Sequence, residues 1–76
     1  MYFIYYGSKK LSGFYPNDIR GVFSFRKNDC YSFQTIQEAQ DFINYINLSV
    51  NKPENKERYG NMQNKHISTA KSLKIN

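Results

Sequence analysis

With 76 residues, a net charge of +5 and a pI of about 9.4, the chain makes one small basic domain at most. Its single cysteine and single histidine exclude a disulfide framework and a structural zinc site of the usual kind. A domain this short buries only about 60% of its unfolded surface, so dimerisation would add buried area and a homodimer stays an open alternative.

Aromatic residues and positive charge occupy different parts of the chain. Twelve of the 13 Phe and Tyr residues lie in residues 1–50, which carry five Lys/Arg against four Asp/Glu. Residues 51–76 carry six Lys/Arg against two Asp/Glu. We therefore divide the chain into an aromatic-rich α+β module (1–50) and a basic polar tail (51–76), and the excess positive charge favours a polyanionic partner.

The first two predicted elements are strands. Residues 2–6 are aromatic and β-branched and stop at Gly7, and residues 11–15 form a second strand. The basic pair Lys9-Lys10 is expected in the turn between them. Both faces of the first strand are apolar or aromatic, so one face should pack on the core while the other presents tyrosines to a partner or a second subunit.

The pattern that follows the second strand allows two interpretations. In the first, Asn17 or Asp18 caps a short helix. In the second, residues 22–25 form a strand, and residues 26–29 form the turn after it. Residues 30–33 are then predicted to form a strand.

A helix is predicted from Thr35 to about Ser49. Thr35 and Glu38 have the spacing of a capping box, in which the hydroxyl and the carboxylate each accept a hydrogen bond from a free amide of the first turn. Apolar residues at helical spacing should lie across the sheet, at positions Ile36, Ala39, Phe42, Ile43, Ile46 and Val50.

The tail is rich in Asn and Lys and poor in apolar residues, which is typical of a disordered segment. Met62, His66, Ala70 and Leu73 nevertheless form a weak helical stripe. A disordered tail and a short basic helix that orders on binding both remain open.

Several motifs of residues 1–46 together resemble one known family. They are a tyrosine-rich first strand ending in Gly7, the basic pair Lys9-Lys10, Gly13-Phe14-Tyr15, Tyr31-Ser32-Phe33 and the helix start from Thr35 to Ile43. With these motifs the chain resembles the N-terminal hybrid-binding domain of eukaryotic ribonuclease H, a module also found in caulimovirus inclusion-body proteins.

The resemblance implies an α+β fold with a small three-stranded antiparallel sheet and a helix packed on one face, in the order β-β-α-β-α. It favours the short-helix interpretation after the second strand. The implied function is recognition of A-form RNA–DNA hybrid or double-stranded RNA. Tyr2 and the basic pair carry over to this chain, whereas Pro16-Asn17 and Tyr31-Ser32 replace a tryptophan and a lysine pair that contact nucleic acid in the family.

No catalytic constellation is visible in the sequence. His66 has no acidic or nucleophilic neighbour, Asp18 and Asp29 resemble turn residues, and a Gly-rich phosphate loop is missing. We therefore expect no enzyme activity, no metal and no cofactor.

The leading prediction is a small non-catalytic RNA-binding protein that recognises double-stranded, structured or hybrid RNA by charge and shape. Lys and Arg side chains would neutralise phosphates, and affinity would fall with added salt. The candidate nucleic-acid-binding residues are Tyr2, Lys9, Lys10, Arg20, Arg26, Lys27, Lys52, Lys56, Arg58, Lys65, Lys71 and Lys74.

The size and composition suit a phage-type accessory protein that sequesters RNA to counter a host defence. We expect a location in the host cytoplasm and no membrane partner, because no apolar run approaches the ~18 residues of a membrane span and the first residues lack the basic start of a signal peptide. The alternative is a protein-binding antagonist that docks a host protein through an exposed tyrosine face.

Overall fold

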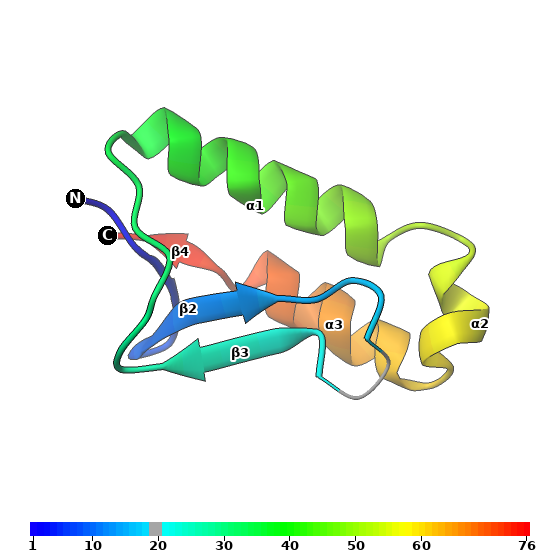
Figure 1. The fold of residues 1–76 in the computed structure, drawn as a ribbon. Coiled ribbons are helices and arrows are strands. Elements are labelled where there is room, and N and C mark those ends of the chain that lie inside the picture. Colours follow the sequence, from blue (N-terminus) through cyan, green and yellow to red (C-terminus); the bar gives the residue numbers. More distant parts are fainter. Residues whose placement is uncertain (19–20) are drawn as a thin grey trace.

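The computed structural model describes residues 1–18 and 21–76 and folds them into an antiparallel sheet with helices (Figure 1). The α+β class predicted from the sequence is confirmed. In chain order the described elements are β1 (Ile4–Tyr6), β2 (Lys9–Phe14), β3 (Phe23–Arg26), α1 (Ile36–Val50), α2 (Asn55–Tyr59), α3 (Met62–Lys71) and β4 (Lys74–Ile75).

The sheet has four strands in the order β3-β2-β1-β4, so the predicted three-stranded β-β-α-β-α topology is wrong. The third strand is β3, which lies where the sequence allowed either a helix or a strand. The described residues between β2 and β3, 15–18 and 21–22, contain no helix. The middle of the short-helix prediction, at Ile19, lies outside the described residues.

The predicted strand over residues 30–33 is also wrong, because Phe33 forms only an isolated bridge to Tyr2 and the Tyr31 amide donates only one hydrogen bond to the Leu11 carbonyl. Asp29 has a φ of 58°, and the half-buried thiol of Cys30 donates a hydrogen bond to the carbonyl of Arg26 at 3.0 Å. These two features turn the chain sharply out of β3, so the segment crosses to α1 in place of forming a further strand.

The turn between β1 and β2 is shorter than predicted. Tyr6 pairs with Lys9, so Gly7 and Ser8 alone connect the strands. Gly7 has a φ of 63°, which a tight two-residue hairpin turn requires and which glycine adopts without steric cost. Lys9 and Lys10 therefore belong to β2, and their positions are fixed by strand pairing.

The predicted N-cap of α1 at Thr35 is confirmed, whereas the second bond of the capping box differs, because the Glu38 carboxylate accepts from the residue before the cap. Thr35 Oγ1 accepts a hydrogen bond from the Glu38 amide at 3.1 Å, and Glu38 Oε2 accepts one from the Gln34 amide at 3.1 Å. Of the predicted apolar stripe, Ile36 is exposed and Phe42 is half-buried, while the remaining positions lie in the core: Ala39, Ile43, Ile46 and Val50.

The segment that follows α1 supplies α2, α3 and β4. His66, Ala70 and Leu73 of the weak stripe are buried, whereas Met62 is 40% exposed. Figure 1 shows α3 behind the sheet and α1 above it, and the two helices pack against each other. The last strand pairs antiparallel with β1, so both ends of the described chain meet in one sheet. Among the described helices, none has the length and hydropathy needed to cross a membrane.

Candidate functional site

The pairing of the strands aligns three cations and one tyrosine across the sheet. Lys10 of β2 lies opposite Arg26 of β3 and also opposite Tyr5 of β1, which in turn pairs with Lys74 of β4. Directly paired residues of antiparallel strands share one face of a sheet. These four side chains therefore form one row across the sheet, which we call the cationic row.

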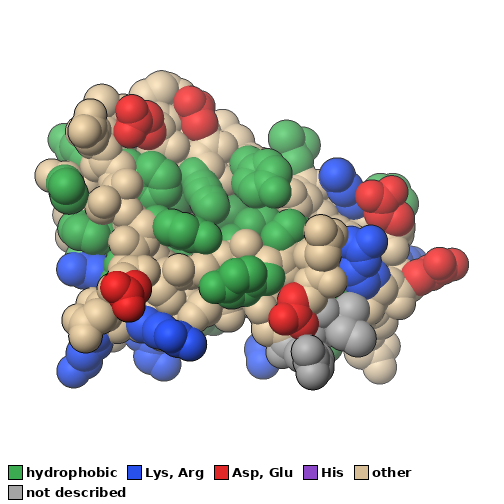
Figure 2. All heavy atoms as spheres, in the orientation of Figure 1, with side chains coloured by type: hydrophobic (Ala, Val, Ile, Leu, Met, Phe, Trp, Pro, Cys, Tyr) green, Lys and Arg blue, Asp and Glu red, His purple; other side chains and the backbone are tan. Residues whose placement is uncertain are grey.

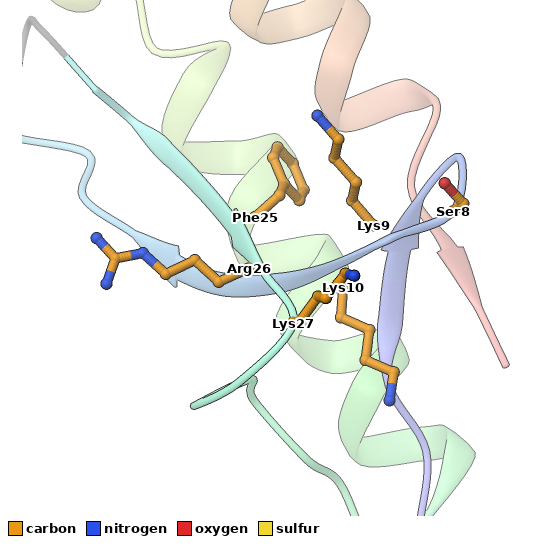
Figure 3. A pocket seen from close by; sticks show the side chains of 6 residues that line it. All are labelled: Ser8, Lys9, Lys10, Phe25, Arg26 and Lys27. Atoms are coloured by element: carbon orange, nitrogen blue, oxygen red, sulfur yellow. The ribbon is translucent and has the colours of Figure 1, made fainter.

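Beside the cationic row, the β2–β3 pair ends in a hollow of about 470 Å³ (Figure 3). Figure 3 shows Lys9 and Phe25 on one side of the strands and Lys10 extending to the other, so the lysines surround the strand ends. We call this feature the basic hollow. Among the described residues, none that lines it is acidic. The lining consists of Ser8, Lys9, Lys10, Phe25, Arg26 and Lys27.

Aromatic rings hold parts of the basic hollow in place. The Lys10 ammonium lies 4.1 Å from the centre of the Phe3 ring, a cation–π contact that fixes the side chain without neutralising it. Phe25 stacks on Tyr6 with ring centres 5.3 Å apart. The hollow therefore offers a positioned positive charge and a supported ring.

The electrostatics of this end of the sheet favour an anionic ligand. Like charges directly opposite each other on paired strands are unfavourable for a sheet. Lys10 and Arg26 are such a pair, and Lys9 and Lys27 add two further positive charges to the hollow. An anion bound between them would relieve this repulsion.

The structure brings some of the predicted binding residues together and leaves others apart. Tyr2 is half-buried beside Phe33, and Arg58 donates hydrogen bonds to Asn17 at 2.9 Å and to Asn55 at 3.4 Å, so its guanidinium braces α2. Arg20 lies outside the described residues. Five predicted lysines are exposed and do not line the basic hollow: Lys52, Lys56, Lys65, Lys71 and Lys74, the last of which belongs to the cationic row.

Sequence analysis missed Phe25 as a site residue, although the signal was present. The run Phe23-Ser24-Phe25 before Arg26-Lys27 alternates as a strand does, and it ends in two cations. Once that run is a strand paired with β2, Phe25 must lie near the β2 lysines, because Leu11 pairs with Phe25 and Lys10 with Arg26.

A second surface is formed by aromatic rings between α1, the segment before it and β2. Phe42 is at its centre, with ring centres 5.2 Å from Tyr31, 5.7 Å from Phe33, 5.9 Å from Tyr45 and 6.5 Å from Phe14. We call these five rings the aromatic cluster. Figure 2 shows hydrophobic side chains gathered on the face of the molecule between α1 and β2.

Neither surface resembles a metal centre. In residues 1–18 and 21–76, no group of three or more His, Cys, Asp or Glu side chains is placed to hold a metal ion. Cys30 and His66 also belong to separate parts of the fold, the turn after β3 and the buried face of α3.

Comparison of the chain with protein-family models, with curated proteins and with solved structures finds no match. The functional argument therefore depends on the basic hollow, the cationic row and the aromatic cluster.

Proposed function

We propose that this protein is a small non-catalytic RNA-binding protein that recognises structured RNA or RNA–DNA hybrid through the basic hollow and the cationic row. The observation that carries the proposal is the like-charge pair Lys10 and Arg26, placed directly opposite each other in a hollow without acids. Phosphates that bind along this pair would neutralise both cations and release counterions.

The shape of the cationic row supports an A-form partner. Neighbouring strands lie about 4.8 Å apart, so the row from Arg26 on β3 to Lys74 on β4 extends over about 14 Å. The wide, shallow minor groove of an A-form duplex presents 2′-hydroxyls and phosphates to such a flat surface. Sequence-specific reading of B-DNA, by contrast, mostly uses an element that enters the major groove.

The proposal is tested by fluorescence polarisation with four labelled probes: double-stranded RNA, RNA–DNA hybrid, single-stranded RNA and B-DNA. We expect tighter binding of the two A-form duplexes, with an affinity that falls steeply between low and physiological salt. Absence of binding to every probe at physiological salt would overturn the proposal.

Two matched double variants separate a site from general positive charge. Lys9→Gln with Lys10→Gln and Lys56→Gln with Lys71→Gln each remove two positive charges, but only the first pair lines the basic hollow. We expect about a tenfold or greater loss of affinity for the first pair and a much smaller loss for the second. Equal losses would mean that charge acts diffusely.

A phage-type accessory role remains part of the proposal: the protein would sequester RNA in the host cytoplasm and so counter a host defence. A second candidate function is docking of a host protein through an exposed tyrosine face, with no RNA involved. It is favoured by Tyr6, Tyr15 and Tyr45, which are 41%, 50% and 52% exposed. Docking predicts weak salt dependence and loss of binding on Tyr→Ala substitution.

A further inference from the structure

The stretch of residues 28–51 differs from the rest of the chain in its charge. It contains Asp29, Glu38 and Asp41 and no Lys or Arg, in a chain that has 11 Lys/Arg and a net charge of +5. The stretch begins after β3 and ends at the C-cap of α1, so it includes the whole of that helix. One part of this basic protein is therefore acidic.

The same stretch supplies most of the aromatic cluster. Tyr31 and Phe33 come from the segment before α1, and Phe42 and Tyr45 come from α1 itself. Tyr45 is 52% exposed, and Leu48, about one turn further along the helix, is 71% exposed. Figure 2 shows the hydrophobic side chains between α1 and β2 at the surface of the molecule. An exposed apolar face rimmed by polar residues marks a site of interaction with another macromolecule.

Two acids stand beside these rings because of the helical period of α1. Glu38 is four residues before Phe42. Asp41 is four residues before Tyr45, and residues four apart are neighbours on the surface of a helix. Both acids are exposed, and Figure 2 shows acidic side chains along the upper edge of the hydrophobic face, over α1. Both carboxylates accept hydrogen bonds from neutral amide groups, so their negative charges remain.

The charge of this surface determines the kind of partner that it fits. A nucleic acid or an anionic membrane would be repelled by the acids, whereas a cationic partner with an apolar side would match both the acids and the rings. We call this surface the acidic aromatic face, and its residues are Glu38, Asp41, Phe42, Tyr45 and Leu48.

The spacing of the exposed residues on α1 suits a helical partner. Asp41, Tyr45 and Leu48 follow one another at intervals of four and three residues, so they form a ridge along the helix. Helices pack by placing such ridges into the grooves of a neighbouring helix. An amphipathic helix with Lys and Arg beside its apolar side would bring apolar contacts and positive charges to the face together.

We propose that the acidic aromatic face docks a basic amphipathic helix of a partner protein. Apolar side chains of that helix pack on Tyr45 and Leu48, and its Lys or Arg side chains pair with Glu38 and Asp41. The inference stands apart from the proposed RNA-binding function, since the basic hollow and the cationic row include none of these residues. Unlike the second candidate function, it is compatible with RNA binding and specifies the charge of the partner.

The test uses two labelled synthetic peptides, measured by fluorescence polarisation without RNA. One is an amphipathic helix of Leu and Lys, and the other has Glu in place of every Lys. We expect the Leu/Lys peptide to bind more tightly although the protein has a net charge of +5, and added salt should weaken its binding. Net charge alone predicts the opposite order, so equal or tighter binding of the Leu/Glu peptide overturns the inference.

A charge reversal and its matched control locate the binding site. Asp41→Lys and Glu57→Lys make the same change in charge, but Glu57 is an exposed residue of α2, which contributes no residue to the face. Asp41→Lys should weaken binding of the Leu/Lys peptide about fivefold or more, and Glu57→Lys should weaken it much less. Equal losses would mean that the peptide responds to overall charge, which overturns the inference.

Leu48→Gln and Ile36→Gln test the apolar contact in the same way. The two side chains are 71% and 56% exposed, but Ile36 is the first residue of α1 and lies about two and a half turns before Tyr45. Leu48→Gln should weaken binding of the Leu/Lys peptide about tenfold, whereas Ile36→Gln should change it little. Thermal unfolding checks that all variants are folded.

The two proposals fail separately. Leu48→Gln should leave RNA affinity unchanged, and the double variant Lys9→Gln with Lys10→Gln should keep peptide binding, because the two surfaces share no residue. Absence of binding to both peptides overturns the docking inference alone. A dimer of the free protein in light scattering that Leu48→Gln dissociates also overturns it, because the face would then bind a second copy of this chain.

Discussion

The aromatic cluster and the basic hollow lie on the same sheet and contribute to the molecule in opposite ways. In the aromatic cluster, Phe42 contacts four other rings, and these contacts attach α1 to Phe14 of β2 and to the segment before the helix. In the basic hollow, the described lining residues include four cations and no acid, and two of these cations, Lys10 and Arg26, are directly paired across the strands. The contrast teaches that ring packing stabilises the molecule at the aromatic cluster. The basic hollow instead gathers positive charges, which an anionic ligand would neutralise.

The largest effect is expected from breaking the aromatic cluster at its centre. Phe42→Ala should lower the free energy of unfolding by about 3 kcal/mol, because four rings lose a partner and a cavity remains. Urea denaturation followed by circular dichroism measures the change, with Phe42→Leu as a milder control. The folded fraction should still bind RNA, and a loss below about 1 kcal/mol would contradict the central role of Phe42.

A smaller effect is expected at the start of α1, the helix that carries part of the aromatic cluster. Thr35→Ala removes the hydroxyl that accepts the Glu38 amide and should destabilise the protein by about 1 kcal/mol. The exposed loop residue Ser32 offers a control, because Ser32→Ala should leave the urea midpoint nearly unchanged. Equal shifts for both variants would argue against a cap at Thr35.

The basic hollow should respond in the opposite direction. Arg26→Gln removes one member of the like-charge pair, so we expect the free energy of unfolding to rise by about 0.3 kcal/mol while RNA affinity falls. Arg58→Gln makes the same change in charge but gives up hydrogen bonds to Asn17 and Asn55, so it should destabilise the protein. A destabilising Arg26→Gln would remove the electrostatic argument for the site.

The smallest effect depends on the pH and comes from His66, a buried residue of α3 whose ring lies between those of Tyr59 and Phe23. Burial lowers the pKa of His66 in the folded protein, so the unfolded chain binds the proton first. The contribution to stability is complete above the unfolded pKa of about 6.5 and is lost as the pH falls below it. Denaturation between about pH 5 and pH 7 measures this loss, which His66→Gln should reduce.

The sequence predicts α1 well because its signals are local. The hydroxyl of Thr35, the carboxylate of Glu38 and the apolar stripe behind them all act within a few turns of one helix. The weak stripe of α3 is visible for the same reason, although its polar composition equally suited a disordered segment.

The short strands are harder to predict because their partners determine them. β4 has two residues and exists as a strand only because Ile75 and Lys74 pair with β1. Likewise, the residues before α1 look like a strand, yet after the bend at Asp29 only isolated backbone contacts form, at Tyr31 and Phe33. Local propensity cannot decide between these two outcomes.

The candidate site was predictable in its members but not in its arrangement. Lys9, Lys10, Arg26 and Lys27 stand out as cations in the sequence, but the register of β2 and β3 decides that Lys10 faces Arg26. That register includes an irregularity between Leu11 and Gly13, which shifts the pairing beyond it. No composition or periodicity reveals such a shift.

The pairing of β4 with β1 also has a consequence for how the protein folds. Ile4 pairs with Ile75 and Phe3 exchanges backbone hydrogen bonds with Asn76, so these contacts join opposite ends of the sequence. Contacts between distant residues raise the contact order and slow folding, because a long loop must close before they form. During synthesis, the β1–β2–β3 meander and α1 can assemble early, whereas the edge of β1 stays open until residues 74–76 have left the ribosome. Until then, that unpaired edge is the part of the nascent chain most exposed to pairing with another strand.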